Sequence, residues 1–270
     1  MIDASPASGA RVLRDLVFAE YPGFRPVTLD LHLPDAAGPV PVVLELHGGG
    51  WRVGRRGQFT PLVSEERSFG RVTAAGFAVV AADYRLSGEA AFPAQVHDVE
   101  GALAWIGEHA DAHGLDASRV VLWGGSAGGT LAALVGLQGH PSVRGVIDWY
   151  GPSDLFEMAR FTAGRDAPGQ SREDQWLGAP VASVPDAAAA ASPALQVVEG
   201  APPFHLAHGV DDADVPPAQS GLLAEALHAH GVEVEFHLEP GAGHFWRGAS
   251  DEATDALFDR AIAFARRVVA

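Results

Sequence analysis

Short apolar runs, separated by stretches of helical periodicity, constrain the fold of this chain more than any other feature. Val40–Leu46 is nearly continuous in apolar residues and ends at His47, which is typical of a strand buried on both faces. Val27–Leu33 alternates apolar and polar residues, as an early half-exposed strand does. Five later runs complete the series: Phe77–Ala82, Val120–Trp123, Val146–Tyr150, Phe204–His208 and Val232–Leu238. The alternation predicts an α/β fold with a mostly parallel central sheet flanked by helices.

Helical patterns lie between these runs. Apolar residues recur at spacings of three and four from Val96 to Ile106, and Gly114 ends that segment. Similar patterns predict helices within residues 216–231 and 256–264. The prediction of alternating strands and helices therefore extends to the end of the chain.

The stretch from Gly151 to Gly200 breaks this rhythm. It places about 50 residues between two predicted strands, where an ordinary crossover needs about a dozen. Its composition, rich in Pro, Gly and Ala, does not indicate a second core. We therefore expect residues 1–270 to form a single domain, with residues 151–200 as a small cap or lid insertion over the site.

Missing residue types narrow the chemistry. The absence of Cys excludes thiol catalysis, disulfides and Cys-ligated zinc. Each of the 18 basic residues is Arg, which excludes a P-loop lysine, a Schiff base and a Ser–Lys dyad.

The net charge of −16 argues against nucleic acid and anionic membrane surfaces as partners. No apolar stretch follows Met1–Pro6 as in a signal peptide, and no apolar run reaches the length of a membrane span. A cytoplasmic location is the resulting expectation. The oligomeric state is not readable from this sequence.

A candidate nucleophile lies in Gly124-Gly125-Ser126-Ala127-Gly128, a G-x-S-x-G pattern. It directly follows the run Val120–Trp123 and opens the helical segment Thr130–Leu137. Such a strand–turn–helix junction needs glycines because side chains would collide with the neighbouring backbone. The turn would lift the Ser126 hydroxyl above the sheet edge, at a helix N-terminus that favours negative charge.

A second glycine-rich segment, His47-Gly48-Gly49-Gly50-Trp51, follows the first buried run. Backbone N–H groups without side chains can stabilise the oxyanion of a tetrahedral intermediate. A further donor should come from the residue after the nucleophile, Ala127. His47 is expected to hold this loop in place and not to act as a base.

The remaining members of a triad should follow as acid and then histidine, each just after a late strand. His244, flanked by Gly243, follows Val232–Leu238 and is the predicted base. Asp211, Asp212 and Asp214 compete for the role of acid after Phe204–His208, and Asp212 has the favoured motif position.

A metal site in the segment of the aspartates is a weaker hypothesis. His205 and His208 would have to converge on one ion, yet they lie on opposite faces of the predicted strand. We therefore expect no metal.

Together these motifs resemble the α/β-hydrolase superfamily, and within it the small bacterial esterases of the feruloyl-esterase-like and hormone-sensitive-lipase-like groups. The resemblance extends from His47 to His244. Gly125 departs from hormone-sensitive-lipase-like members, which usually carry an acidic residue there, so the feruloyl-esterase-like group fits better. Further matching segments are Asp83–Leu86, Phe92–Gln95 with Asp98, Tyr150–Asp154, Ser192-Pro193, and His208–Pro216 with Gln219-Ser220.

The resemblance implies a carboxylic ester hydrolase that needs no cofactor and acts on a small-molecule ester, with short acyl or compact aryl groups. It implies a triad of Ser126, Asp212 and His244. The oxyanion hole would be formed by Gly49, Gly50 and Ala127, while Asp83, Tyr84 and Arg85 would be structural supports. For substrate contacts, we expect the large apolar side chains near the site: Trp51, Phe156, Phe161 and Trp176.

Three alternatives remain at this point. An amidase like kynurenine formamidase shares the histidine–glycine loop and the triad. The segment His208–Pro216 also resembles prolyl oligopeptidases, although the chain has no propeller domain. A non-catalytic ligand-binding protein usually lacks a triad member, and none is missing here.

Overall fold

We describe a computed structural model of the chain, covering residues 11–57, 59–167 and 169–270. Met1–Pro6, the segment considered for a signal peptide, lies outside the described residues. In the described part, no helix is long and apolar enough to cross a membrane.

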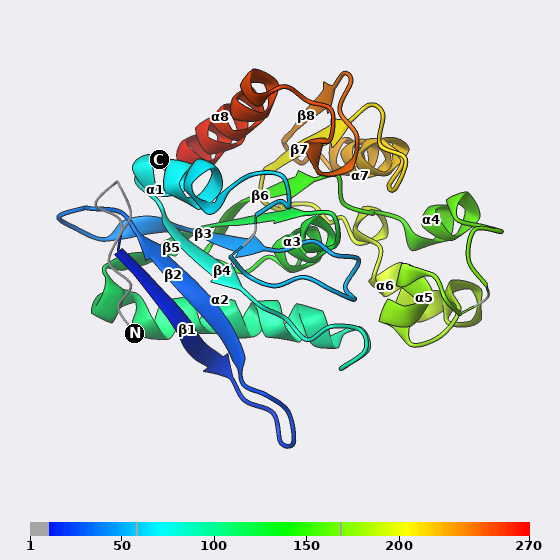
Figure 1. Ribbon diagram of the computed structural model, residues 1–270, viewed down its shortest axis with the longest axis horizontal. Coiled ribbons are helices and arrows are strands. Elements are labelled where there is room, and N and C mark those ends of the chain that lie inside the picture. Colours follow the sequence, from blue (N-terminus) through cyan, green and yellow to red (C-terminus); the bar gives the residue numbers. More distant parts are fainter. Residues whose placement is uncertain (1–10, 58, 168) are drawn as a thin grey trace.

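The centre of the molecule is an eight-stranded sheet with the order β1-β2-β4-β3-β5-β6-β7-β8 (Figure 1). β2 pairs antiparallel with β1 and β4, and every pair from β4 to β8 is parallel. The strands are β1 (Arg11–Ala19), β2 (Val27–Leu33), β3 (Val40–Leu46), β4 (Ala78–Ala82), β5 (Leu115–Gly125), β6 (Val143–Trp149), β7 (Phe204–Gly209) and β8 (Val234–Glu239). The predicted α/β-hydrolase architecture, a mostly parallel sheet, is confirmed.

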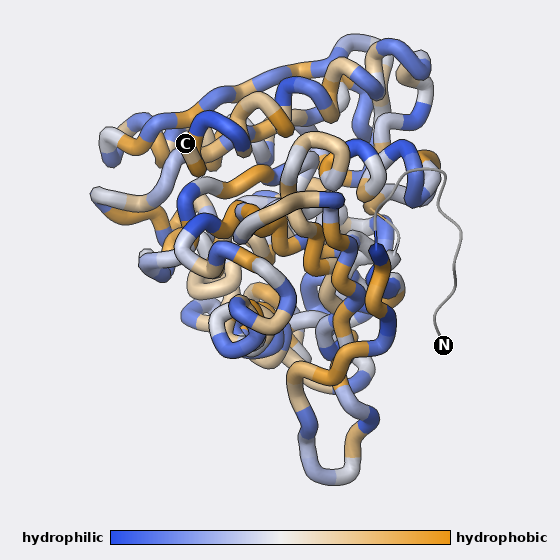
Figure 2. Tube along the Cα trace, turned by 90° about the vertical axis from the view of Figure 1, so that its left-hand side faces the viewer, coloured by the Kyte–Doolittle hydropathy of each residue, from blue (hydrophilic) through white to orange (hydrophobic). Residues whose placement is uncertain are grey.

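Helices cover both faces of the sheet. α2 (Ala94–His113), α3 (Ala127–Leu137) and α7 (Ala218–Ala229) share one core with side chains such as Val42 and Leu44. α1 (Arg71–Ala74), preceded by a π-helical turn η1 (Glu66–Gly70), and α8 (Asp251–Val268) cover the other face, where Val43 and Val79 point. Alternate residues of one strand thus enter opposite cores, which explains the continuous apolar runs. Figure 2 shows hydrophobic segments in the interior and hydrophilic ones at the outer turns.

The segment after β6 leaves the sheet at its carboxyl edge and returns at β7. It contains α4 (Leu155–Phe161), α5 (Arg172–Leu177), α6 (Pro185–Ala190) and the short 3₁₀ helices η2 (Val181–Ser183) and η3 (Pro193–Leu195). In Figure 1, α4, α5 and α6 lie together beside the body, away from β1 and β2. α4 and α5 begin with side-chain caps from Asp154 and Ser171, which accept hydrogen bonds from the first-turn N–H groups.

β1 was not predicted, for identifiable reasons. Two register shifts interrupt its pairing with β2, and Asp15 has a positive φ of 60°. This irregular edge strand is half exposed, so its sequence lacks a regular apolar period.

Glu45 is an unexpected ionisable residue in the sheet. It is fully buried on β3 between Ala81 of β4 and Trp123 of β5, and both carboxyl oxygens are without a hydrogen-bond partner in the described structure. Burial, followed by the nearby charge of Asp83, raises the pKa of Glu45 well above its ordinary value.

Glu45→Gln is therefore expected to stabilise the protein at neutral and alkaline pH. A raised folded-state pKa gives stability that is present below the unfolded-state pKa and is lost as pH rises. We expect the variant's free energy of unfolding to exceed the wild type's by on the order of 2 kcal/mol near pH 8. Urea denaturation across about pH 4 to 8 measures this, and the difference should fade towards pH 4. A difference that does not vary with pH would contradict a protonated, buried Glu45.

Candidate active site

Ser126 stands on a sharp turn between β5 and α3. Its φ of 56° and ψ of −124° are strained for a residue with a side chain, and its N–H donates to the Trp149 carbonyl at 2.8 Å. The turn requires glycine on both sides. A Cβ at Gly124 would lie 2.2 Å from the Gly128 backbone, and one at Gly128 would lie 1.9 Å from the Leu46 carbonyl oxygen.

His244 lies after β8, in the short 3₁₀ helix η4 (His244–Trp246). Its Nδ1 is 2.7 Å from Asp212 Oδ2, and its Nε2 is 3.0 Å from Ser126 Oγ. Since an ionised carboxylate only accepts, Nδ1 carries the proton, and Nε2 is left to accept from the Ser126 hydroxyl. The structure thus brings the three predicted triad residues together, and each is at most 6 % exposed.

Asp212 is held by several donors in the loop after β7. Its Oδ1 accepts from the backbone N–H groups of Asp214 and Val215, each at 2.9 Å. Burial opposes ionisation, but hydrogen bonds from His208 and His244 outweigh it and hold the pKa of Asp212 well below its usual range. The competing Asp211 is exposed, and Asp214 faces Arg172 at 3.5 Å.

The glycine-rich loop after β3 passes directly beside Ser126. Leu46 pairs with Gly124 in the sheet, and a Cβ at Gly48 would lie 3.4 Å from Ser126 Cβ. Gly50 and Ala127 line one pocket together with Ser126. Gly49 is not among the lining residues. It has a φ of 121°, and its carbonyl accepts from the N–H groups of Arg52 and Val53.

His47 lies behind this loop. Its Nδ1–H donates to the Gly48 carbonyl at 2.7 Å, its ring stacks on Tyr84 at 4.2 Å, and the Tyr84 hydroxyl donates back to the His47 carbonyl at 2.9 Å. Burial lowers the pKa of His47, which favours the neutral ring. Arg85 pairs with the fully buried Asp98. These contacts fix the strand ends that carry the site.

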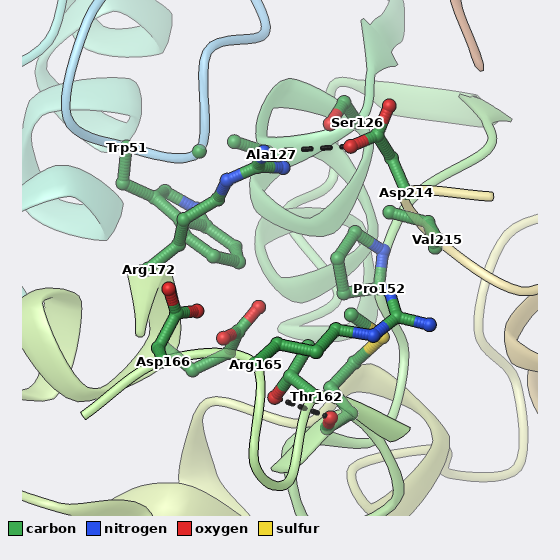
Figure 3. Close-up of a pocket in the computed structure, with 13 residues that line it drawn as sticks. Trp51, Ser126, Ala127, Pro152, Thr162, Arg165, Asp166, Arg172, Asp214 and Val215 are labelled. Atoms are coloured by element: carbon green, nitrogen blue, oxygen red, sulfur yellow. Dashed lines mark hydrogen bonds and ion pairs between the residues drawn. The ribbon is translucent and has the colours of Figure 1, made fainter. Parts of the chain in front are cut away.

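A pocket of about 220 Å³ opens above Ser126 (Figure 3). One wall is formed by the glycine-rich loop after β3 and by α3, and the facing wall comes from the segment after β6. Arg172 crosses from that segment towards Asp214 in the acid loop. The lining residues are Gly50, Trp51, Ser126, Ala127, Pro152, Met158, Thr162, Arg165, Asp166, Arg172, Glu173, Asp214 and Val215.

Of the four expected substrate contacts, only Trp51 lines this pocket. Trp176 is fully buried, stacks on Trp51 at 4.0 Å and donates its indole N–H to Gln95. Phe156 packs against the core that α2, α3 and α7 share. The Arg165 guanidinium lies over the Phe161 ring, 4.1 Å from the ring centre. These three side chains are not among the residues that line the pocket, and their direct contact with substrate stays a prediction.

Polar and charged residues take their place, and the sequence analysis missed them. Glu173 is 3 % exposed in the wall, and burial raises its pKa. The charged run Arg172-Glu173-Asp174 at the start of α5 was the available signal. Only the fold shows which of these side chains face the nucleophile.

The expected divergence of His205 and His208 is observed. His205 Nδ1 approaches Glu235 at 3.1 Å, while His208 Nδ1 meets Ser220 Oγ at 2.7 Å. Among the described residues, no group of three or more His, Cys, Asp or Glu side chains could hold a metal ion.

A parallel sheet with a nucleophile elbow at one strand end, and a histidine and an acid at two later ones, defines an α/β-hydrolase with the geometry of a serine hydrolase. Comparison with known proteins agrees. The sequence model of the BD-FAE family matches residues 29–227, and the chain belongs to that family.

Curated relatives include the esterase LipQ and the carboxylesterase NlhH of Mycobacterium tuberculosis. Each is 31% identical to this chain in an alignment that covers 83% of this chain. The chain covers 55% of LipQ and 72% of NlhH. These relatives confirm the predicted enzyme class, carboxylic ester hydrolases.

Solved structures give the same picture. A bacterial heroin esterase has a TM-score of 0.75 and 29% identity, with 97% of this chain and 84% of that one covered. A truncated carbohydrate esterase from gut microbiota has a TM-score of 0.84 and covers 100% of this chain and 99% of its own, but at 23% identity it supports the fold alone.

Proposed function

We propose that this chain hydrolyses small carboxylic esters, with short acyl or compact aryl groups, through an acyl-enzyme on Ser126. The observation that carries the proposal is the continuous hydrogen-bonded series from Ser126 Oγ through His244 to Asp212, at 3.0 and 2.7 Å. This series opens onto a pocket next to glycine-loop N–H groups.

In the acylation step, His244 Nε2 removes the hydroxyl proton as Ser126 Oγ attacks the ester carbonyl carbon. Asp212 fixes the imidazole tautomer and stabilises the imidazolium that forms. The N–H groups of Gly49, Gly50 and Ala127 would stabilise the oxyanion, and Gly50 and Ala127 line the pocket. The imidazolium then protonates the departing alcohol oxygen.

Deacylation repeats these steps with water. His244 takes a proton from the water molecule as its oxygen attacks the acyl carbonyl, and the collapse of the intermediate returns the proton to Ser126 Oγ. The chain's own side chains suffice for every proton transfer.

The segment 151–200 acts in our proposal as a cap that limits substrate size. It supplies Met158, Thr162, Arg165 and Arg172 to the pocket wall, across from Ser126. A volume of about 220 Å³ is below that of ordinary drug-sized ligand pockets, which favours compact groups. The cytoplasmic location stays a prediction.

Met158→Ala should move the acyl-chain cutoff to longer chains. Met158 is 2 % exposed on α4 and lines the pocket, so its removal leaves room for added methylenes. Each methylene in such a pocket is worth about 1–3 kcal/mol in kcat/KM. Steady-state kinetics on p-nitrophenyl esters from acetyl to octanoyl would show the shift. Phe161→Ala, on the same helix but outside the lining, is the matched control and should not move the cutoff. Equal profiles for wild type and Met158→Ala would contradict a cap that sets size.

A kynurenine-formamidase-like amidase uses the same triad, so the two activities are separated by kinetics. We expect kcat/KM for short aryl esters to exceed that for N-formylkynurenine by a large factor. A higher kcat/KM for N-formylkynurenine than for the esters would contradict the proposed esterase and favour the amidase.

A further inference from the structure

His208 is a second histidine that contacts the acid of the triad, Asp212. It lies on β7, one residue before the end of the strand, is fully buried, and its Nε2 approaches Asp212 Oδ2 at 3.3 Å. The same carboxyl oxygen accepts from His244 Nδ1 at 2.7 Å. One oxygen of Asp212 thus contacts two histidines, while its other oxygen accepts two backbone N–H groups.

The partners of His208 fix its protonation. Nε2 is also 3.0 Å from the Val215 carbonyl oxygen, and both that oxygen and the ionised Asp212 can only accept. Nε2 therefore carries a proton that it shares between the two. Nδ1, 2.7 Å from Ser220 Oγ, is left to accept from the Ser220 hydroxyl when the ring is neutral.

These contacts join three elements that meet at the acid. His208 belongs to β7, Asp212 and Val215 to the following loop, and Ser220 to the first turn of α7. A rotation of the Asp212 side chain away from His244 would break the His208 contact and both backbone contacts. Buried, fully connected polar networks of this kind hold one side-chain orientation.

We propose that His208 is a positioning residue of the catalytic centre, which orients Asp212 towards His244 so that five side chains, Ser220, His208, Asp212, His244 and Ser126, form one continuous series of polar contacts. His208 does not touch substrate. Its effect reaches Ser126 through the orientation of Asp212 and of the imidazole of His244. This inference rests on the proposed ester hydrolysis at Ser126.

The test compares His208→Leu, which removes the donor, with His208→Gln, whose amide N–H can replace it. For His208→Leu we expect kcat to fall on the order of 10- to 100-fold, because small misplacements of catalytic groups have effects of that size. KM should stay within about twofold, since binding of the ground state is unchanged. His208→Gln should recover most of the loss.

The matched control is His205→Leu. His205 is a buried histidine on the same strand, 2 % exposed, but it contacts Glu235 and not the triad. It should lower the melting temperature without changing kcat. A proton NMR spectrum adds a readout independent of turnover. The downfield signal of the His244 Nδ1 proton, in its short bond to Asp212, should shift or broaden in His208→Leu and persist in His205→Leu.

The outcomes separate the two claims. An inactive folded wild type would refute the proposed function itself. An active wild type, with His208→Leu keeping kcat within about threefold, or with His208→Gln and His208→Leu losing equally, would overturn the positioning role. If His208→Leu does not fold, Ser220→Ala and His208→Gln carry the test. Ser220→Ala removes the donor to His208 Nδ1 and should lower kcat, whereas His208→Gln should keep kcat near the wild-type value. An unchanged kcat in Ser220→Ala would then refute the inference.

Discussion

Ser126→Ala should abolish ester hydrolysis while the fold persists. Ala at this position removes only Oγ, the atom that would attack the substrate and that bonds His244 Nε2 at 3.0 Å. Loss of a triad nucleophile lowers kcat by about 10⁶-fold in other serine hydrolases. Steady-state assays on p-nitrophenyl acetate, with circular dichroism and thermal melting of the same samples, would measure both effects.

A suitable comparison is Ser153→Ala. Ser153 is a buried serine near the end of β6, bonded to Gln219 and not to the triad. It should cost stability and leave most of the activity. Ester hydrolysis by folded Ser126→Ala at a rate near that of the wild type would refute the assignment of the nucleophile.

Asp212→Asn is expected to lower kcat by on the order of 10⁴-fold, as acid-to-amide changes do in other triads. The amide oxygen can take the place of Oδ1, which accepts from the Asp214 and Val215 N–H groups. The NH₂ group then faces His244 Nδ1 and selects the tautomer whose proton sits on Nε2. That imidazole can no longer accept the proton of Ser126.

Asp211→Asn provides the control for this change. Asp211 is adjacent in sequence but exposed, so its amide should leave kcat near the wild-type value. Asp214→Asn removes the partner of Arg172 at the pocket wall and should act more on KM than on kcat. The largest loss at Asp211 or Asp214 would show that the acid is misassigned.

The parts predictable from sequence were those that depend on strand order and on local turn chemistry. Buried parallel strands are recognisable as apolar runs, and β3 begins and ends at the predicted residues, Val40–Leu46. The antiparallel β2 also has its predicted bounds, Val27–Leu33, but it is buried and not half-exposed as predicted. Because the carboxyl ends of such strands meet at one edge, motifs that follow them converge. Ser126, Asp212 and His244 were found in this way.

The pocket could not be predicted in the same way. Its wall is built from short helices whose orientation depends on tertiary packing, so Met158 and Arg172 face Ser126 whereas Phe156 and Trp176 do not. The sequence indicates His208 as the start of the segment His208–Pro216 and as diverging from His205, but not as a neighbour of Asp212. Its link to Asp212 depends on the loop that returns through Val215 to α7, which periodicity does not describe.

Labelling with a fluorophosphonate, followed by peptide mapping, tests the central claim most directly. The reagent phosphonylates serine hydroxyls that an adjacent base activates, and it requires no knowledge of the natural substrate. Cleavage after arginine places Ser126 in the peptide Val120–Arg144, which also contains Ser142, so fragment ions must separate the two serines. We predict one adduct per chain, located on Ser126, with loss of ester hydrolysis in proportion to labelling. An adduct confined to another serine, or active folded protein that the reagent leaves unlabelled, would contradict the proposed mechanism.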